Sequence, residues 1–465
     1  MTFSAQPPTE RAYLVGVELK RPRDEFPIED SLDELAQLAR TAGLDVVGRA
    51  VQHIERINPG TLIGKGKLQE VIAARADAPY DVLLFDEELH PNQQREIETA
   101  FEGTDIKVLD RTAIILDIFA QHARTKEGGL QVELAQYEYR LPRLTRMWTH
   151  LARQAGGASG RGGTGGVGLR GPGERQLEID RREIRTRISR LKTQIEDVRT
   201  HRREYRRKRR KEGVPVVAIV GYTNAGKSTL LNALTNAGVL VEDKLFATLD
   251  PTTRRVKLPS GGEALFTDTV GFIQKLPTQL VAAFRATLEE ITEADVLLHV
   301  LDATHPNVRD QARAVAETLE EIDAGDKPMV VAFNKVDRLV NTKERGDQGT
   351  LLPHSNSELS RRDAARNEKQ WLVTQDDMLS DPEAVRISAL KGQGLDDLLV
   401  RVEQVLGENM VEMYVRIPFS ANELAALFHQ RGIVDSEEFT EKGTLIQGKI
   451  AASLVKRFER YEIDG

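Results

Sequence analysis

The segment from Gly221 to Ser228 constrains the fold of this chain more than any other part of the sequence. It reads G-Y-T-N-A-G-K-S, follows the apolar run Val214–Val220 and precedes a helical pattern that begins at Thr229. A loop of this spacing between a strand and a helix directs backbone N–H groups at phosphate oxygens, beside the positive end of the helix dipole. We therefore predict an α/β domain with a parallel sheet, helices on both faces and a nucleoside-triphosphate site at this loop.

Two side chains of this loop have specific expected roles. Lys227 is placed to reach the β- and γ-phosphates, and the Ser228 hydroxyl is placed to ligate Mg²⁺. The alternative, a plain glycine turn, is disfavoured by the strand before the loop and the helix after it. The nucleotide-binding residues expected here are Gly221, Tyr222, Thr223, Asn224, Ala225, Gly226, Lys227 and Ser228.

A second motif, D-T-V-G, follows the apolar segment Glu263–Thr267. Asp268 is expected to hold Mg²⁺ through water, and the Gly271 N–H group to bond the γ-phosphate, so that hydrolysis releases the loop that follows. The expected nucleotide-binding residues of this motif are Asp268, Thr269, Val270 and Gly271.

Two later motifs predict that the base is guanine. The Asp337 carboxylate can accept both guanine N1–H and N2–H₂, which adenine does not offer, and Asn334 helps to hold the base and the loop. The motif S-A-L after Val385–Ile387 supplies backbone N–H groups near the guanine O6 atom. The residues concerned are Asn334, Lys335, Val336, Asp337, Ser388, Ala389 and Leu390.

The loop Leu245–Thr253 has to supply a threonine that senses the γ-phosphate through Mg²⁺. Its position alone leaves Thr248, Thr252 and Thr253 as candidates. Phe272 follows Gly271, where many small GTPases carry a glutamine that orients the attacking water. A phenyl ring has no group that can orient water. This holds even if the only role of Phe272 is to pack in the loop. We therefore expect slow intrinsic hydrolysis that a partner accelerates.

The composition is that of a cytoplasmic protein that does not span a membrane. The chain has 465 residues, 40% of them hydrophobic, and no cysteine, so no disulfide or thiolate metal site is available. The N-terminus lacks a secretory core, and no apolar run approaches the roughly 20 residues that span a bilayer. Peripheral membrane association stays open, and we expect a monomer when the protein is free.

The charge of the chain is segregated. The net charge is −7, yet Arg140–Glu212 carries +14, and no acidic residue lies between Tyr139 and Gly173. A solvated helix face or disorder are the alternatives for such a stretch. The large positive charge of this stretch, next to a glycine-rich loop, favours nucleic-acid binding.

Alternating apolar strands and amphipathic helices predict an N-terminal α/β domain over residues 1–110 with a mainly parallel sheet. Its segment Gly60–Lys67 opens a helix, and is either a phosphate cradle or, more simply, a glycine turn. The expected strands are Tyr13–Leu19, Asp45–Ile54, Asp81–Phe85 and Ile106–Leu109, and the expected helices are Ser31–Thr41, Lys67–Ala76 and Asn92–Phe101.

Residues 111–212 are expected to form a hairpin of two long helices. Apolar side chains recur every three or four residues from Leu130 to Leu151, where Pro142 should kink the helix, and again from Leu177 to Tyr205. The glycine-rich basic loop 156–173 joins them, as an RNA-binding element or as a passive tether. The GTPase domain covers 213–408, with a polar insertion at 338–366, and a small α/β domain covers 409–465.

This order of parts resembles the HflX family of bacterial GTPases, chiefly through the segments Phe246–Arg254 and Gly60–Lys67. The resemblance implies a GTPase, using Mg²⁺, that binds the large ribosomal subunit and its RNA and splits stalled ribosomes. It also implies Thr248 as the switch threonine and second Mg²⁺ ligand, with Lys227, Thr248 and Gly271 in the catalytic centre. The nucleotide-sensing segment is then Phe246, Ala247, Thr248, Leu249 and Asp250.

Two other functions fit the sequence. A large-subunit assembly or storage factor would use GTP as a checkpoint and would leave intact ribosomes associated. A signalling switch that regulates a membrane protease would act through protein contacts. The basic hairpin argues against the signalling switch, because protein contacts of that kind do not require it.

Overall fold

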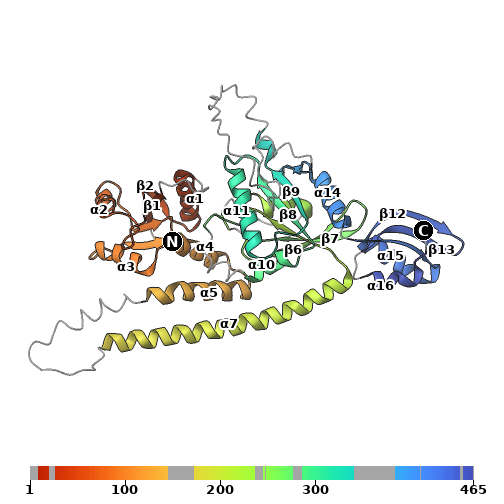
Figure 1. Cartoon of the computed structure of the whole chain (residues 1–465), viewed down its shortest axis with the longest axis horizontal. Helices are drawn as coiled ribbons and strands as arrows, with labels where there is room; N and C mark the ends of the chain where they lie inside the picture. The colour runs from red at the N-terminus through yellow and green to blue at the C-terminus, as the bar shows by residue number, and fades with distance from the viewer. Residues whose placement is uncertain are drawn as a thin grey trace, which may run out of the picture. The chain divides into compact units, whose positions relative to one another are not determined.

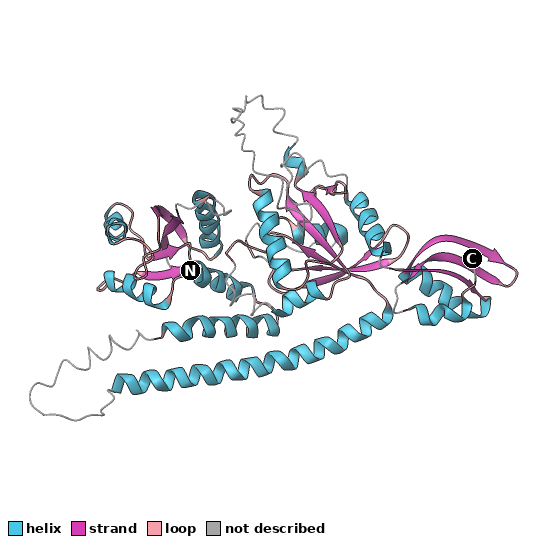
Figure 2. Ribbon diagram, viewed as in Figure 1, coloured by secondary structure: helices cyan, strands magenta, loops and turns pink. Residues whose placement is uncertain are grey.

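The structure is a computed structural model that describes residues 9–19, 27–144, 172–235, 245–246, 248–275, 285–339, 383–408, 410–450 and 454–463. The chain divides into two compact units (Figure 1). Unit 1 contains the chain up to Arg203 together with Lys244–Asp250 and Lys275–Ala286, and unit 2 contains the remainder. Helices and strands alternate in both units, which confirms the predicted multidomain α/β class (Figure 2).

The first part of unit 1 is a four-stranded parallel sheet in the order β2-β1-β3-β4. The predicted strands and helices are all present, with ends that differ by a few residues. All four residues of β3 are buried, as expected for a strand covered on both faces. The elements are β1 (Arg11–Leu19), α1 (Ile28–Thr41), β2 (Asp45–Ile54), α2 (Lys65–Ala73), β3 (Val82–Phe85), α3 (Pro91–Ala100) and β4 (Lys107–Asp110).

Three helices complete unit 1: α4 (Arg111–His122), α5 (Lys126–Arg140) and α7 (Pro172–Glu212), the last of which extends into unit 2. Helix α5 ends at Arg140, so its regular hydrogen bonding is interrupted beside Pro142, where the sequence predicts a kink. Leu141–Arg143 form a 3₁₀ turn, since proline cannot supply the N–H group that α-helical continuation needs.

The second helix of the predicted hairpin is confirmed as α7. Leu191 is fully buried, and Ile184, Ile188, Ile195 and Val198 of the predicted seam are half-buried. Helices α5 and α7 lie side by side (Figure 1) and are joined by the ion pairs Glu127–Arg202, Glu133–Arg187 and Glu138–Lys192 at 2.7–2.8 Å. Residues 145–171, with most of the glycine-rich loop and the end of the first seam, lie outside the described residues.

Unit 2 contains a six-stranded sheet in the order β10-β9-β8-β5-β7-β6, parallel except for β6. Its inner strands are almost continuous runs of buried apolar residues, because helices cover both faces. The strands are β5 (Val216–Val220), β6 (Thr252–Lys257), β7 (Glu263–Asp268), β8 (Val296–Asp302), β9 (Met329–Asn334) and β10 (Val385–Arg386). The helices are α8 (Lys227–Thr235), α10 (Arg285–Thr292), which begins in unit 1, α11 (Val308–Glu321) and α14 (Leu395–Glu408).

A three-stranded antiparallel sheet closes unit 2, in the order β11-β13-β12. The strands and helices of this part agree with the α/β class predicted for it, and β12 has an acidic, exposed centre. The elements are β11 (Val411–Ile417), α15 (Asn422–Arg431), β12 (Gly432–Thr440), β13 (Gly443–Ile450) and α16 (Val455–Phe458). In the described part of the chain every helix is too short or too polar to cross a membrane. Most of the insertion at 338–366 lies outside that part.

Candidate functional site

The phosphate loop lies between β5 and α8, as the sequence predicts. Gly221 and Gly226 have φ angles of 150° and 94°, which favour glycine. A Cβ atom on Gly221 would lie 2.3 Å from the carbonyl oxygen of Val300, and one on Gly226 would lie 2.3 Å from Nδ2 of Asn334. Both glycines are therefore required by close neighbours as well as by the backbone conformation.

Lys227 is buried within the loop that it closes. Its Nζ atom donates hydrogen bonds to the carbonyl oxygens of Gly221, at 3.0 Å, and Tyr222, at 2.8 Å. Burial lowers the pKa of Lys227 to about 8, Asp268 opposes this shift, and Lys335 adds to it. An anionic phosphate beside the ammonium group would favour its charged form.

Ser228 and Asp268 lie side by side although they belong to α8 and β7. The Ser228 Oγ atom donates to Oδ2 of Asp268 at 2.6 Å. A hydroxyl and a carboxylate are hard oxygen donors of the kind that Mg²⁺ prefers, so the pair fits this ion, with phosphates and water as its other ligands. Across the described ranges, no group of three or more His, Cys, Asp and Glu side chains is arranged to hold a metal.

The D-T-V-G motif lies against the phosphate loop. The Thr223 N–H group donates to the Phe272 carbonyl at 2.7 Å, and the Phe272 N–H group donates to the Gly221 carbonyl at 3.1 Å. A Cβ atom on Gly271 would lie 2.9 Å from the Cα atom of Thr223 and 3.0 Å from Nζ of Lys227. The Phe272 ring is 1% exposed, so it packs in the interior and offers no group to water.

Asn334 joins two loops of the site. Its Nδ2 atom donates to the Ala225 carbonyl at 2.9 Å, and its Oδ1 atom accepts from the Ala389 N–H group at 2.9 Å. The first bond holds the phosphate loop and the second holds the S-A-L loop. The structure therefore brings together three motifs that are far apart in the sequence.

Lys335 and Asp302 form an ion pair at the ends of β9 and β8. The Lys335 Nζ atom lies 2.7 Å from Oδ2 of Asp302 and donates to the Asn224 carbonyl at 2.8 Å. Burial raises the pKa of Asp302, but hydrogen bonds from Lys335 and Thr304 and the charge of Lys335 lower it overall. Sequence reasoning missed Asp302, and the available signal was an aspartate at the carboxyl end of the apolar run Val296–Leu301.

Asp337 is held beside the S-A-L loop. Its Oδ1 atom accepts a hydrogen bond from the Ser388 hydroxyl at 2.7 Å, and Lys391 lies 4.0 Å from Oδ2. Leu390 is 74% exposed. This geometry fixes the orientation of the Asp337 carboxylate, as a base-reading group requires.

The predicted sensing segment 246–250 is divided between different surroundings. Thr248 is half-buried, whereas Thr252 and Thr253 belong to β6 and are fixed by pairing with β7. Phe246 is buried and packs edge-on against Phe119 within unit 1, with ring centroids 4.7 Å apart. Ala247 lies outside the described residues.

The Asp250 side chain is engaged in unit 1. Its Oδ2 atom accepts hydrogen bonds from the N–H groups of Arg124, at 2.9 Å, and Thr125, at 2.7 Å, and the Thr125 hydroxyl also bonds its Oδ1 atom. Thr125 is the N-cap residue of α5. The contacts of Asp250 and the burial of Leu249 account for these two side chains without a nucleotide.

The Gly60–Lys67 segment opens helix α2, as the sequence predicts. Its N–H groups from residue 60 to residue 64 are already bonded within unit 1, mainly to Asn58 and Gln52. A phosphate cradle would need these groups to point at the ligand. The plain-turn interpretation therefore fits the geometry better.

Four family models match the chain. Residues 29–120 match GTP-binding GTPase N-terminal, 122–209 match GTP-binding GTPase Middle Region, 216–335 match 50S ribosome-binding GTPase, and 375–461 match HflX C-terminal domain. The four matches together account for most of the described chain.

Two bacterial GTPases are similar to this chain over almost their whole length. GTPase HflX of Lacrimispora saccharolytica is 44% identical over 447 residues, 96% of this chain and 94% of that protein. GTPase HflX of Escherichia coli is 39% identical over 436 residues, 94% of this chain and 92% of that protein. A GTP-binding protein from Sulfolobus solfataricus, solved with GDP, is 24% identical and covers 86% of this chain and 99% of its own, with a TM-score of 0.41.

Proposed function

The chain belongs to the HflX family of GTPases, and from this premise we propose that it binds the large ribosomal subunit and dissociates stalled or idle ribosomes. It is a GTP hydrolase, and HflX GTPases are generally associated with ribosomes. In the proposed cycle, GTP orders the sensing loops, the helical hairpin docks on ribosomal RNA, and hydrolysis stimulated by the ribosome releases the protein. Its place of action is the cytoplasm, where it is monomeric when free.

The chemistry rests on residues around the phosphate loop. Lys227 binds the β- and γ-phosphates, and the Gly271 N–H group bonds the γ-phosphate. Ser228 and Thr248 are the proposed Mg²⁺ ligands, with Asp268 acting through water. When bound, Mg²⁺ supplies charge neutralisation between the phosphates. The contact between Ser228 and Asp268 supports this assignment.

Recognition of guanine is assigned to Asp337 and the S-A-L loop. The Ser388 hydroxyl orients the Asp337 carboxylate, which accepts two hydrogen bonds from the base. Asn334 supports this arrangement because its Oδ1 atom accepts a hydrogen bond from the Ala389 N–H group. These contacts support a site that rejects adenine nucleotides.

Hydrolysis is proposed to depend on the ribosome because of Phe272. The buried ring stands where other GTPases place a water-orienting glutamine. A group from the ribosome, or a loop that the ribosome orders, then completes the site.

The observation that carries the ribosomal part of the proposal is the basic surface of α7. Along one stretch of this helix Arg182, Arg185 and Arg190 are exposed. Cations spaced along a rigid helix suit the phosphates of an RNA backbone, and their contribution to binding falls as salt rises.

The test compares GTP turnover with and without purified large subunits, for the natural protein and for a variant with Arg182, Arg185 and Arg190 each replaced by glutamine. We expect turnover well above the basal rate with the natural protein. The variant should bind more weakly, and its salt slope should fall by about one for each replaced arginine that binds a phosphate. Arg309→Gln, an exposed position on α11, is the control. No stimulation of the natural protein would refute the proposal.

Light scattering of intact ribosomes separates splitting from the alternative of a large-subunit assembly or storage factor. A splitting factor with GTP lowers the scattering as the subunits part, whereas an assembly factor leaves it unchanged. Deletion of residues 156–173 should spare GTP binding and abolish splitting. Undiminished splitting by that deletion variant would remove the loop from the proposal.

A further inference from the structure

Thr223, in the phosphate loop, has a buried hydroxyl group that the roles assigned above do not use. The residue is 6% exposed, and its Oγ1 atom has no hydrogen-bond partner among the residues that the structure describes. A hydroxyl left unbonded in the interior costs free energy, because it gives up its hydrogen bonds to water. Valine would fill the same space without this cost, so the presence of a hydroxyl at this position needs an explanation.

A second buried threonine shows that burial of an unbonded hydroxyl does not by itself indicate a ligand. Thr112, in α4 of unit 1, is 0% exposed, and within the described ranges its Oγ1 atom likewise lacks a partner. It lies in the first turn of a helix that none of the nucleotide motifs includes. What distinguishes Thr223 from Thr112 is therefore the set of groups around it.

The side chain of Thr223 lies beside the two groups assigned to the γ-phosphate. A Cβ atom on Gly271 would lie 2.9 Å from Cγ2 of Thr223 and 3.0 Å from Nζ of Lys227. Both atoms are thus close to one point, which is a single bond away from the Gly271 Cα atom. The Thr223 methyl group, the Lys227 ammonium group and the Gly271 backbone are therefore neighbours within unit 2.

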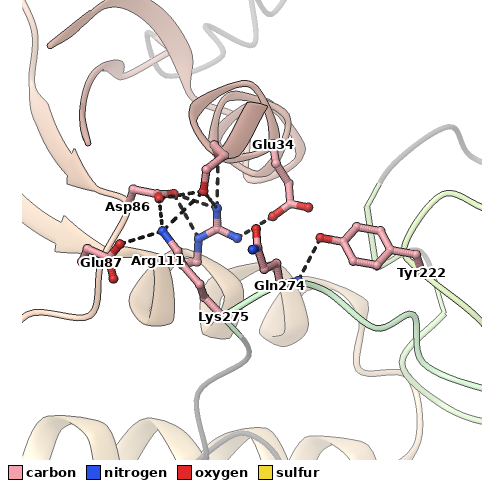
Figure 3. A network of polar contacts seen from close by, with 8 residues as sticks. Glu34, Asp86, Glu87, Arg111, Tyr222, Gln274 and Lys275 are labelled. Atoms are coloured by element: carbon pink, nitrogen blue, oxygen red, sulfur yellow. Dashed lines mark hydrogen bonds and ion pairs between the residues drawn. The ribbon is translucent and has the colours of Figure 1, made fainter. Parts of the chain in front are cut away.

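The backbone of Thr223 is held in place without help from its hydroxyl. Its N–H group donates to the Phe272 carbonyl at 2.7 Å. Close by, the Gln274 N–H group donates to the Tyr222 hydroxyl at 2.9 Å, and Tyr222 also pairs with Phe272 as a parallel bridge (Figure 3). These bonds join the phosphate loop to the D-T-V-G segment, so the Thr223 hydroxyl is not needed for this connection.

One rotation about the Cα–Cβ bond of Thr223 brings its hydroxyl to the place of its methyl group. Such a rotation leads from one staggered rotamer to another. The hydroxyl then faces Lys227 and Gly271, where the γ-phosphoryl oxygens are expected. A hydroxyl has one hydrogen to donate, and its bond to a charged oxygen is stronger than its bond to a neutral one.

We propose that the Thr223 hydroxyl is a further γ-phosphate ligand of the GTPase site: it donates to a γ-phosphoryl oxygen and so favours GTP over GDP. GDP has no γ-phosphate, so with GDP the hydroxyl stays unbonded and the cost of its burial remains. The phosphate loop then distinguishes the two nucleotides directly, in addition to the D-T-V-G motif. The inference rests on the assignment of Lys227 and Gly271 to the γ-phosphate proposed above.

The test is the equilibrium affinity of the full-length protein for GDP and for a non-hydrolysable GTP analogue, both with Mg²⁺. Thr223→Val keeps the shape of the side chain and removes the hydroxyl. It should weaken binding of the analogue by about tenfold or more, as expected for a hydrogen bond to a charged group, and leave GDP affinity nearly unchanged. Thr112→Val, the control, removes the other buried hydroxyl and should change neither affinity.

Thr223→Ser and Thr223→Ala form a second pair of variants that differ only by the hydroxyl. The serine variant should bind the analogue about tenfold or more tightly than the alanine variant does. This comparison decides the question even if valine disturbs the loop. Urea denaturation checks the fold of each variant, and Thr223→Val should be at least as stable as the natural protein, because the hydroxyl that it loses is unbonded.

Equal analogue affinities within each pair would overturn the proposal. Equal losses of GDP and analogue affinity in Thr223→Val, or a loss of its stability, would overturn it as well, because they would assign the hydroxyl a purely structural role. Lys227→Ala tests the assignment on which the proposal rests. Undiminished analogue binding in that variant would refute the γ-phosphate site itself, whatever the Thr223 variants show.

Discussion

The Asp250 carboxylate accepts a hydrogen bond from the backbone N–H group of Thr125 at 2.7 Å, across 125 positions of sequence. The carboxylate thereby binds the N–H group of the residue that precedes α5. The hydroxyl of the same residue, Thr125, accepts a hydrogen bond from the Gly128 N–H group at 3.0 Å. A segment predicted to sense the nucleotide thus helps to cap a helix of unit 1.

Asp250→Ala should lower the free energy of unfolding of unit 1 by about 1 kcal/mol, the usual cost of removing a helix cap. Chemical denaturation followed by circular dichroism measures it. Asp105→Ala, at an exposed position of the same unit, is the control and should change little. Equal stability of the two variants would contradict the capping role.

Gly128→Ala tests the same contact from the other side. A Cβ atom there would lie 2.4 Å from Oδ1 of Asp250, so the substitution should destabilise the natural protein. In the Asp250→Ala background the clash is absent, and alanine should be tolerated or even stabilise α5. A double-mutant cycle measures this coupling, and strictly additive effects would show that the two residues do not interact.

The elements of both sheets were predictable because their signals are local. The apolar run before Gly221 and the alternation around Val82–Phe85 each depend on a few neighbouring residues. The phosphate loop and the guanine motifs are likewise short, and their mutual contacts through Asn334 follow from parallel strands ending at one edge.

The contacts that Asp250 and Lys275 make within unit 1 were not predictable in this way. Lys275 and Asp86 are 189 positions apart, and neither stands in a distinctive pattern. Asp250 belongs to a motif that was expected to face the nucleotide. The sequence therefore did not indicate that its carboxylate bonds the backbone at the start of α5. Contacts of this kind depend on tertiary packing, which periodicity and spacing do not encode.

The stability of unit 2 should fall as the pH drops from about 6.5 to about 4, because of His299. Burial within β8 lowers the pKa of His299 to about 4, and the nearby charge of Lys227 adds to the shift. Below pH 6.5 the unfolded chain binds a proton that the folded chain does not, so stability is lost until the folded pKa is reached. The loss amounts to about 3 kcal/mol. Urea midpoints at several pH values measure it, and His299→Gln should flatten the profile over this interval.

Asp337→Asn should weaken GTP binding and improve binding of xanthosine triphosphate. An asparagine amide replaces one carboxylate acceptor by a donor, which matches the extra oxygen of xanthine and not the guanine amino group. Loss of hydrogen bonds to a charged group should cost on the order of a hundredfold in GTP affinity. The Ser388 hydroxyl can still donate to the remaining carbonyl oxygen, so the loop should stay in place. Competition between the two nucleotides measures the shift, and undiminished GTP selectivity would exclude Asp337 as the base-reading residue.

Phe272 allows packing to be separated from catalysis. Because its ring is 1% exposed, Phe272→Ala should destabilise unit 2 by about 3–5 kcal/mol, since it removes buried apolar packing and leaves a cavity. Phe272→Leu retains most of the volume and should cost about 1 kcal/mol.

Basal GTP turnover of the leucine variant should stay near that of the natural protein, since the ring has no part in orienting water. Denaturation and single-turnover assays on both variants, with and without large subunits, measure these effects. A large fall in basal turnover for the leucine variant at unchanged stability would instead assign the ring a direct role in the reaction.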